Sequence, residues 1–193
     1  MSLFRGILVG LVAVGMLAGG AQTSWADLLV VDDFDRGKKP NKLGGDFGAW
    51  NKDPDDPTQF CRNGFDKTNA YGKVGYCLRL DYDVDSPNPA YNGFWSKLSS
   101  IDLRPYKQLT FYVKGDSSKG YTDQIKVELK NERETGRHVV KGVTDQWQQV
   151  SISLKDFTGL SDLSKVTEFV IVFDDITSTK KVGTIYVDDI MFE

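Results

Sequence analysis

The feature that most constrains this chain is the alternation of apolar and polar residues over short stretches. In residues 125–130, for example, Ile125, Val127 and Leu129 alternate with charged residues. A period of two with one apolar face is typical of β-strands that pack on a core from one side. Residues 169–173 are apolar on both faces, which indicates a central strand. The predicted strands span residues 28–34, 76–84, 109–114, 125–130, 150–154, 169–173 and 185–192.

The stretches between these strands have the composition of turns. Gly, Pro, Asn and Asp cluster in residues 36–48, 51–58, 85–93 and 115–123, and one helical turn is expected within 156–164. Many short strands joined by polar turns are typical of a β-sandwich. We therefore expect an all-β sandwich or jelly roll, in a single domain that spans residues 27–193.

The N-terminal residues have the pattern of a secretory signal peptide. Arg5 precedes an apolar run over residues 6–19, and the small residues Ser24 and Ala26 fit a cleavage site. The run is shorter than the ~20 residues that span a bilayer as a helix. We expect a signal peptide at 1–26 and a periplasmic or secreted protein with no membrane span after cleavage. An uncleaved N-terminal anchor is the alternative.

Net charge argues against a nucleic-acid partner. The formal net charge of the 193 residues is −3, and no segment is strongly basic. Binding to nucleic acids depends mainly on positive charge that neutralises phosphates. No nucleic-acid partner is therefore expected.

Cys61 and Cys77 are the only two cysteines. In an exported chain an isolated pair favours a disulfide bond. Two buried free thiols are the alternative.

Acidic residues cluster near both ends of the expected domain. Residues 32–35 read Asp-Asp-Phe-Asp, and residues 187–190 read Val-Asp-Asp-Ile. Carboxylates within apolar strands are costly unless they are paired, solvated or bound to a cation, and oxygen ligands suit calcium. We expect one structural calcium ion that joins the first and last strands through Asp33, Asp35 and Asp188. Ordinary solvated acids at strand ends are the alternative.

Aromatic residues in Gly- and Asn-rich contexts are candidates for sugar binding. They include Trp50 and the run Tyr-Asn-Gly-Phe-Trp at 91–95. An aromatic ring can cover the apolar face of a sugar while nearby amides and charges meet its hydroxyls. Packing in the core is the alternative for each ring.

Catalytic motifs are scarce in this chain. His138 is the only histidine, and no serine lies in a Gly-x-Ser-x-Gly pattern. A structural or ligand-contacting role is the better interpretation of His138. The many acids include residues that could form a glycosidase pair, although loops favour Asp for other reasons. We expect that the protein is not an enzyme.

Several segments, in order, resemble the family 11 carbohydrate-binding modules and the related family named for complex I intermediate-associated protein 30. These segments are Leu29–Asp35, Asn92–Ser96, Leu103–Gly115, Asp145–Phe157, Phe169–Asp174 and Gly183–Ile190. The resemblance implies an all-β jelly roll of the galactose-binding-domain type with a concave face, calcium near the chain ends and β-glucan binding.

The resemblance also assigns roles to individual residues. It places Trp50, Phe94 and Phe173 at aromatic positions of the cleft and puts Arg137 and His138 in a neighbouring polar region. We expect Asn51 and Asn92 to meet sugar hydroxyls beside these rings. Residues 158–165 are much shorter than the loop that closes one side of the cleft in the family, so we expect weak binding, in the micromolar to millimolar range.

These observations predict an exported carbohydrate-binding domain that holds a polysaccharide or oligosaccharide on its concave face. A protein-interaction or assembly factor on the same fold is the alternative, and a glycan-active enzyme is a third and weaker one.

Overall fold

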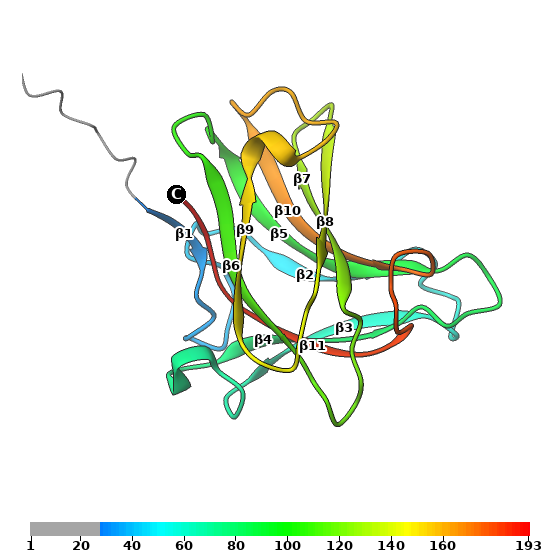
Figure 1. The fold of residues 1–193 in the computed structure, drawn as a ribbon. Helices are drawn as coiled ribbons and strands as arrows, with labels where there is room; N and C mark the ends of the chain where they lie inside the picture. Colours follow the sequence, from blue (N-terminus) through cyan, green and yellow to red (C-terminus); the bar gives the residue numbers. More distant parts are fainter. Residues whose placement is uncertain (1–27) are drawn as a thin grey trace, which may run out of the picture.

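The computed structural model of the protein describes residues 28–193, so the predicted signal peptide lies outside the described residues. Two β-sheets pack face to face (Figure 1). The elements are β1 (Leu29–Asp32), β2 (Phe47–Asn51), β3 (Phe60–Asp66), the 3₁₀ turn η1 (Tyr71–Lys73), β4 (Cys77–Asp83), β5 (Tyr91–Ile101), β6 (Gln108–Gly115), β7 (Gln124–Lys130), β8 (Thr135–Lys141), β9 (Gln148–Ser153), the 3₁₀ turn η2 (Leu154–Asp156), β10 (Val166–Asp174) and β11 (Val182–Phe192). None of the helical segments in this range is long and apolar enough to cross a membrane.

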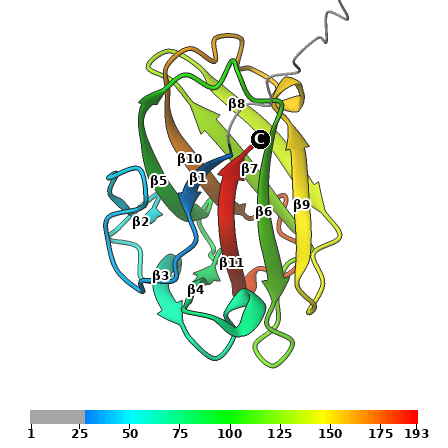
Figure 2. The same ribbon diagram turned by 90° about the vertical axis from the view of Figure 1, so that its left-hand side faces the viewer.

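The strands are antiparallel and form the predicted sandwich. The six-stranded sheet has the order β3-β4-β11-β6-β9, with β1 also paired to β11, and the five-stranded sheet has the order β2-β5-β10-β7-β8. Because β1 pairs with β11, the first and last described strands lie side by side (Figure 2). The prediction of an all-β jelly roll is therefore confirmed.

The core lies between the sheets and is built from alternate residues of each strand. Ile125, Val127 and Leu129 have no exposed surface, as their alternation predicts. Aromatic rings meet across the interface: the ring centroids of Phe111 on β6 and Phe169 on β10 are 6.1 Å apart. This burial of apolar surface is the main favourable contribution to folding.

Four strands were not predicted from the alternation, namely β2, β3, β5 and β8. The first two lie in Gly-, Asn- and Asp-rich sequence, and β5 begins at Tyr91, inside the loop expected over 85–93. Their residues are held extended by pairing with strands far away in the sequence, as Phe47 of β2 pairs with Ser96 of β5. Local composition does not report such pairing. The helical turn also lies earlier than expected: it spans Leu154–Asp156 and shares only Asp156 with the predicted segment 156–164.

The predicted disulfide is wrong, because Cys61 and Cys77 are both free and buried. They lie on the paired strands β3 and β4, but Cys61 is opposite Tyr82 and Cys77 is opposite Asp66. Five residues separate Cys77 from Tyr82, which is roughly 16 Å along a strand at about 3.3 Å per residue. Since five is odd, the two thiols also point to opposite faces of the sheet, beyond the reach of a disulfide.

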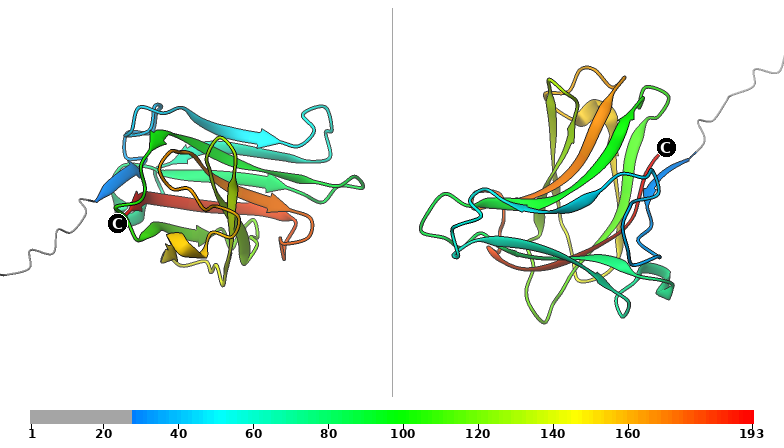
Figure 3. Two further views of the ribbon diagram at one scale, coloured as in Figure 1. Left: turned by 90° about the horizontal axis from the view of Figure 1, so that it is seen from above. Right: turned by 180° about the vertical axis from the view of Figure 1, so that it is seen from behind.

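Two loops join at one end of the sandwich, those that connect β2 to β3 and β4 to β5 (Figure 3). Asp56 in the first loop accepts hydrogen bonds from its own loop at Thr58 and from Asn88 in the second loop. The hydroxyls of Thr58 and Ser86 are also 2.7 Å apart. These contacts fix the backbone that leads into β5.

Candidate ligand-binding groove

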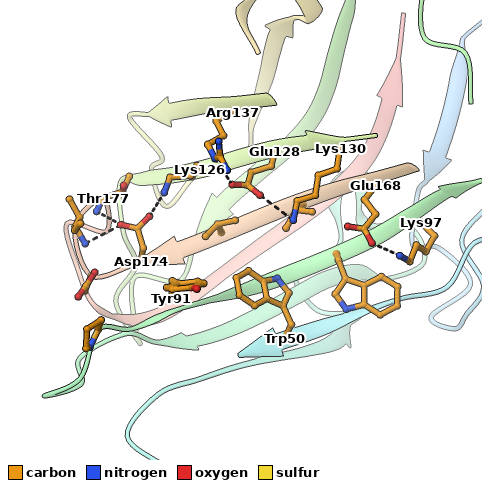
Figure 4. Close-up of a pocket in the computed structure, with 16 residues that line it drawn as sticks. Trp50, Tyr91, Lys97, Lys126, Glu128, Lys130, Arg137, Glu168, Asp174 and Thr177 are labelled. Atoms are coloured by element: carbon orange, nitrogen blue, oxygen red, sulfur yellow. Dashed lines mark hydrogen bonds and ion pairs between the residues drawn. The ribbon is translucent and has the colours of Figure 1, made fainter. Parts of the chain in front are cut away.

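A groove of about 820 Å³ lies on the outer face of the five-stranded sheet, and all five strands contribute to it. Figure 4 shows aromatic rings on the β2 and β5 side, and charged groups that come mainly from β7, β8 and β10. The lining residues are Trp50, Pro89, Tyr91, Trp95, Lys97, Lys126, Glu128, Lys130, Arg137, Glu168, Val170, Val172 and Asp174–Thr177. We call this site the groove.

The aromatic wall consists of Tyr91, Trp50 and Trp95. The rings of Trp50 and Tyr91 meet edge to face with centroids 5.7 Å apart. Trp95 lies opposite Gly48 of β2, and a Cβ atom at Gly48 would stand only 3.3 Å from the indole. The glycine therefore leaves the space in which the indole lies over the neighbouring strand. All three rings keep part of their surface exposed to solvent.

The charged wall is a set of ion pairs. The Glu128 carboxylate contacts Lys130 Nζ at 3.3 Å and Arg137 Nε at 3.1 Å. At one end of the groove Lys97 pairs with Glu168, and at the other Lys126 Nζ lies 2.6 Å from Asp174 Oδ2. Val170 and Val172 of β10 lie between the two walls and form an apolar floor.

The pKa of Asp174 reflects the contacts that fix the end of the groove at Lys126. Burial alone raises the pKa of this carboxyl, but hydrogen bonds from Lys126 and from the backbone N–H of Thr177 outweigh the burial and lower the pKa below its usual range. Asp174 is therefore ionised at neutral pH and holds both the lysine and the turn that follows β10.

Of the predicted ligand-binding residues, Trp50 and Arg137 line the groove. Trp50 is half-buried on β2, and Arg137 is exposed on β8. They reach the site from the two edge strands of the same sheet. The structure thus brings together two residues that are far apart in the sequence.

The positions expected for Phe94, Phe173 and Asn92 need correction, because all three point into the core. Each has no exposed surface. The Phe173 ring stacks on Tyr82 at a centroid distance of 4.0 Å, and Asn92 donates to the carbonyl of Asp83 at 2.7 Å. No ligand can reach these rings without opening the sandwich.

Asn51 and His138 also face inward from their strands. The side-chain oxygen of Asn51 accepts a hydrogen bond from the N–H of Cys61 at 2.7 Å, which fixes β2 against β3. The imidazole of His138 is half-buried, with its centroid 6.2 Å from that of Phe157. Neither residue lines the groove.

The run at 91–95 was a candidate from the sequence, but the site roles were assigned to Asn92 and Phe94, and the structure places Tyr91 and Trp95 in the groove instead. The signal was present in the parity of the strand: Trp95 has the same parity as Lys97, and Phe94 has the same parity as Leu98. Because side chains of a strand alternate between faces, a lysine marks the solvent side and a leucine marks the core.

The predicted calcium ligands lie around the pairing of β1 with β11. Asp188 is buried and accepts a hydrogen bond from the N–H of Tyr71 at 3.1 Å. Burial, together with the charges of Asp189 and Asp35, raises the pKa of Asp188 to about 7. Asp33 instead pairs with Lys42, and Asp35 is exposed.

This cluster contains a polar atom without a partner, since Asp32 Oδ2 is buried and makes no hydrogen bond. Burial raises the pKa of Asp32 to about 6. Even so, in residues 28–193 no three His, Cys, Asp or Glu side chains converge closely enough to hold a metal ion. The acidic side chains of this region therefore repel one another, and they do not form a coordination shell.

Solved structures with the same fold include carbohydrate-binding modules. The chain is similar to the family 11 module of Clostridium thermocellum in complex with a β-1,3-1,4-mixed-linked tetrasaccharide, with 16% identity over 86% of this chain and 94% of that one and a TM-score of 0.62. It is also similar to the CBM27-1 module of Caldicellulosiruptor saccharolyticus in complex with mannohexaose, with 13% identity over 87% and 97% of the two chains and a TM-score of 0.55. At these identities the likeness establishes the fold.

The family itself follows from the sequence. The model of carbohydrate binding domain 30 matches residues 41–193, and the chain belongs to this family. The expected resemblance to family 11 modules is thus confirmed for the jelly-roll fold. A search of curated proteins finds no match.

Proposed function

We propose that the groove binds a polysaccharide or oligosaccharide and that the domain is not catalytic. The observation that carries the proposal is the row formed by Tyr91, Trp50 and Trp95, which faces a wall of ion pairs across a floor of valines. Apolar rings on one side and hydrogen-bonding groups on the other suit a sugar chain, which has C–H faces and hydroxyl edges.

The pairing of charges in the groove supports the proposal that its ligand is an uncharged glycan. Lys97, Lys126, Lys130 and Arg137 are each paired with Glu128, Glu168 or Asp174. A paired charge still offers hydrogen bonds to hydroxyls but attracts neither anions nor cations strongly. Two structures of similar fold hold uncharged ligands, a mixed-linked tetrasaccharide and mannohexaose.

The carboxylates of the groove support a binding role over glycoside hydrolysis. A glycosidase needs a carboxylic acid whose pKa is raised so that it can donate a proton. Here Asp174 has a lowered pKa, and both Glu128 and Glu168 pair with cations. The lowered pKa of Asp174 favours its ionised form, which has no proton to donate.

Binding should be measured by isothermal titration with mixed-linked β-glucan and mannan oligosaccharides on residues 27–193. Trp50→Ala should weaken binding at least about tenfold, which is about 1.4 kcal/mol. Trp147→Ala is a matched control, since this half-buried tryptophan donates from Nε1 to the carbonyl of Asn69 and contacts Tyr71, away from the groove. The control should bind as the parent does.

The outcomes separate the candidate functions. Equal losses in Trp50→Ala and Trp147→Ala would contradict a role for the groove. If the folded parent binds none of a wide panel of glycans, the protein-interaction role on the same fold becomes the better proposal. Release of reducing sugar would overturn the non-catalytic role.

Export to the periplasm or beyond is part of this proposal, and the pattern of residues 1–26 supports it. A polysaccharide ligand is consistent with an extracytoplasmic site. Mass spectrometry of the protein recovered outside the cytoplasm should show an N-terminus at Asp27. An intact N-terminus in a membrane fraction would indicate the anchor instead.

We also propose that calcium binds near Asp33, Asp35 and Asp188, beside the pairing of β1 with β11. Support comes from the repulsion of Asp188 by Asp189 and Asp35 and from the unpartnered oxygen of Asp32. A cation would relieve both. Calcium at about a hundredfold excess over its dissociation constant should raise the unfolding free energy by ~2.7 kcal/mol. Identical melting curves in calcium and in EDTA, after verified metal removal, would contradict the proposal.

A further inference from the structure

The groove ends in an exposed aliphatic side chain that the aromatic row does not explain. Ile176, in the turn between β10 and β11, is 92% exposed and lines the groove. Among the described residues no other large apolar side chain is as exposed. Exposed apolar surface favours contact with an apolar partner, because its removal from water is favourable.

The turn that carries Ile176 is held firmly. Asp174 Oδ1 accepts hydrogen bonds from the N–H of Ile176 at 3.0 Å and of Thr177 at 2.6 Å. The N–H of Ser178 donates to the carbonyl of Asp174 at 3.0 Å. With Lys126 on Asp174 Oδ2, both oxygens of one buried carboxylate are engaged. Ile176 is therefore presented by a fixed turn, and binding need not order the loop first.

This turn lies beside Tyr91, which is at one end of the aromatic wall. Asp174 of β10 is opposite Tyr91 of β5, and the N–H of Asp175 donates to the carbonyl of Ala90 at 3.1 Å. Figure 4 shows Tyr91, Asp174 and Thr177 together at one end of the groove, with Lys97 and Glu168 at the other. Tyr91 itself is 43% exposed. Both ends of the groove carry an ion pair, but only the end at Tyr91 is also closed by a turn that presents an exposed aliphatic side chain.

We propose that Ile176 and Tyr91 form an end subsite that grips the last sugar ring of a chain lying along the groove. The inference rests on the proposed function and names a specificity-determining residue within it. The isoleucine contacts the C–H face or edge of a pyranose that the tyrosine also contacts. Sugar chains long enough to extend from Trp95 past Tyr91 fill this subsite, and short ones that sit on Trp50 and Trp95 do not.

The test is a chain-length series. Titration with mixed-linked β-glucan oligosaccharides, from the disaccharide to the hexasaccharide, should show that Ile176→Ser weakens binding of the longest ligand about fivefold to tenfold and of the shortest by less than about twofold. Val74→Ser is the matched control, because Val74 is 66% exposed and does not line the groove. Its affinities should equal those of the parent at every length.

The outcomes distinguish a failure of the end subsite from a failure of the proposed function. A uniform loss at all lengths in Ile176→Ser, or no loss at any length, overturns the end subsite. If Trp50→Ala abolishes binding while Ile176→Ser matches the parent, the proposed function stands and this inference fails. Absence of binding in the parent counts against the proposed function instead. Ile176→Trp, which enlarges the apolar surface, should tighten binding of the hexasaccharide alone.

Discussion

The two faces of strand β5 have opposite roles, although their residues alternate along a single stretch of chain. On the inner face Asn92, Phe94 and Leu98 have no exposed surface. On the outer face Tyr91 and Trp95 line the groove. Phe94 and Trp95 are adjacent, yet one ring is part of the core and the other is open to a ligand.

The difference shows that an aromatic residue is a binding candidate only when its strand parity and its neighbours leave a face free. Phe94 packs against the rings of Phe47 and Phe34, with centroids 5.7 and 6.5 Å away. Trp95 lies over Gly48, with the amine of Lys97 5.5 Å from its ring. The inner ring contributes to stability and the outer ring is available for recognition.

The largest expected effect is that of Phe94→Ala. Removal of this fully buried ring should lower the free energy of unfolding by about 3–5 kcal/mol, because it deletes apolar contacts and leaves a cavity. Urea denaturation followed by fluorescence measures it. Any fraction that stays folded should bind glycan as the parent does. A loss under ~1 kcal/mol would break the distinction between the two faces.

Trp95→Ala should produce the opposite pattern. Glycan affinity should fall about 10- to 100-fold, or ~1.4 to 2.8 kcal/mol, since the ring forms part of the aromatic wall. The free energy of unfolding should change by less than about 1 kcal/mol, as is usual for a partly exposed side chain. Titration and denaturation of the same preparation measure both. A core-sized loss of stability at Trp95 would place this ring with the inner face.

Asp174→Asn tests, through the pH dependence of stability, the end of the groove where Asp174 pairs with Lys126. Since the pKa of Asp174 is lowered in the folded state, the folded carboxylate binds fewer protons than the unfolded one. Its contribution to stability is present above the unfolded pKa of ~3.9 and is lost as the pH falls through the lower folded pKa.

We expect Asp174→Asn to be about 1 kcal/mol less stable than the parent near neutral pH, a typical net value for a hydrogen bond. The difference should shrink in strongly acidic solution, below about pH 4. Denaturation across this range measures it, with Asp175→Asn as the neighbouring control. A difference that does not change with pH would mean that Asp174 acts through packing alone.

The smallest effect is expected from reductant. Burial raises the pKa of both thiols, of Cys77 to about 12, and the strands hold them apart. Dithiothreitol should leave the unfolding free energy unchanged, whereas a disulfide closing a loop of this size would contribute about 3 kcal/mol. Alkylation of the unfolded, unreduced protein should modify both cysteines. If neither cysteine were alkylated, the two thiols would be joined in a disulfide and this prediction would be wrong.

Much of the fold was open to prediction from local pattern. The alternation in 125–130 and the doubly apolar run 169–173 identify β7 and the central strand β10, because each side chain reports its own burial. The Gly-rich strand β2 was not predictable in this way. Its residues are extended because β5 supplies their hydrogen-bond partners.

The residues of the candidate site also fall into those that the sequence predicted and those that it did not. Trp50 and Arg137 were found from the sequence, because rings and charges in polar contexts and the family resemblance pointed to them. The choice of Phe94 over Trp95 was wrong even though the parity of Lys97 and Leu98 carries the answer. A resemblance between short motifs does not specify which of two adjacent rings points outward.

The amino-acid sequence by itself determined the class of the fold and the chemistry available to it, since the period of two and the supply of aromatic and charged residues are local properties. Only the tertiary structure decided which side chains meet. Trp50 and Trp95 form one wall because β2 pairs with β5, and Ile176 joins Tyr91 because β10 pairs with β5. Pairing between distant strands depends on the packing of the whole sandwich, and no local pattern contains it.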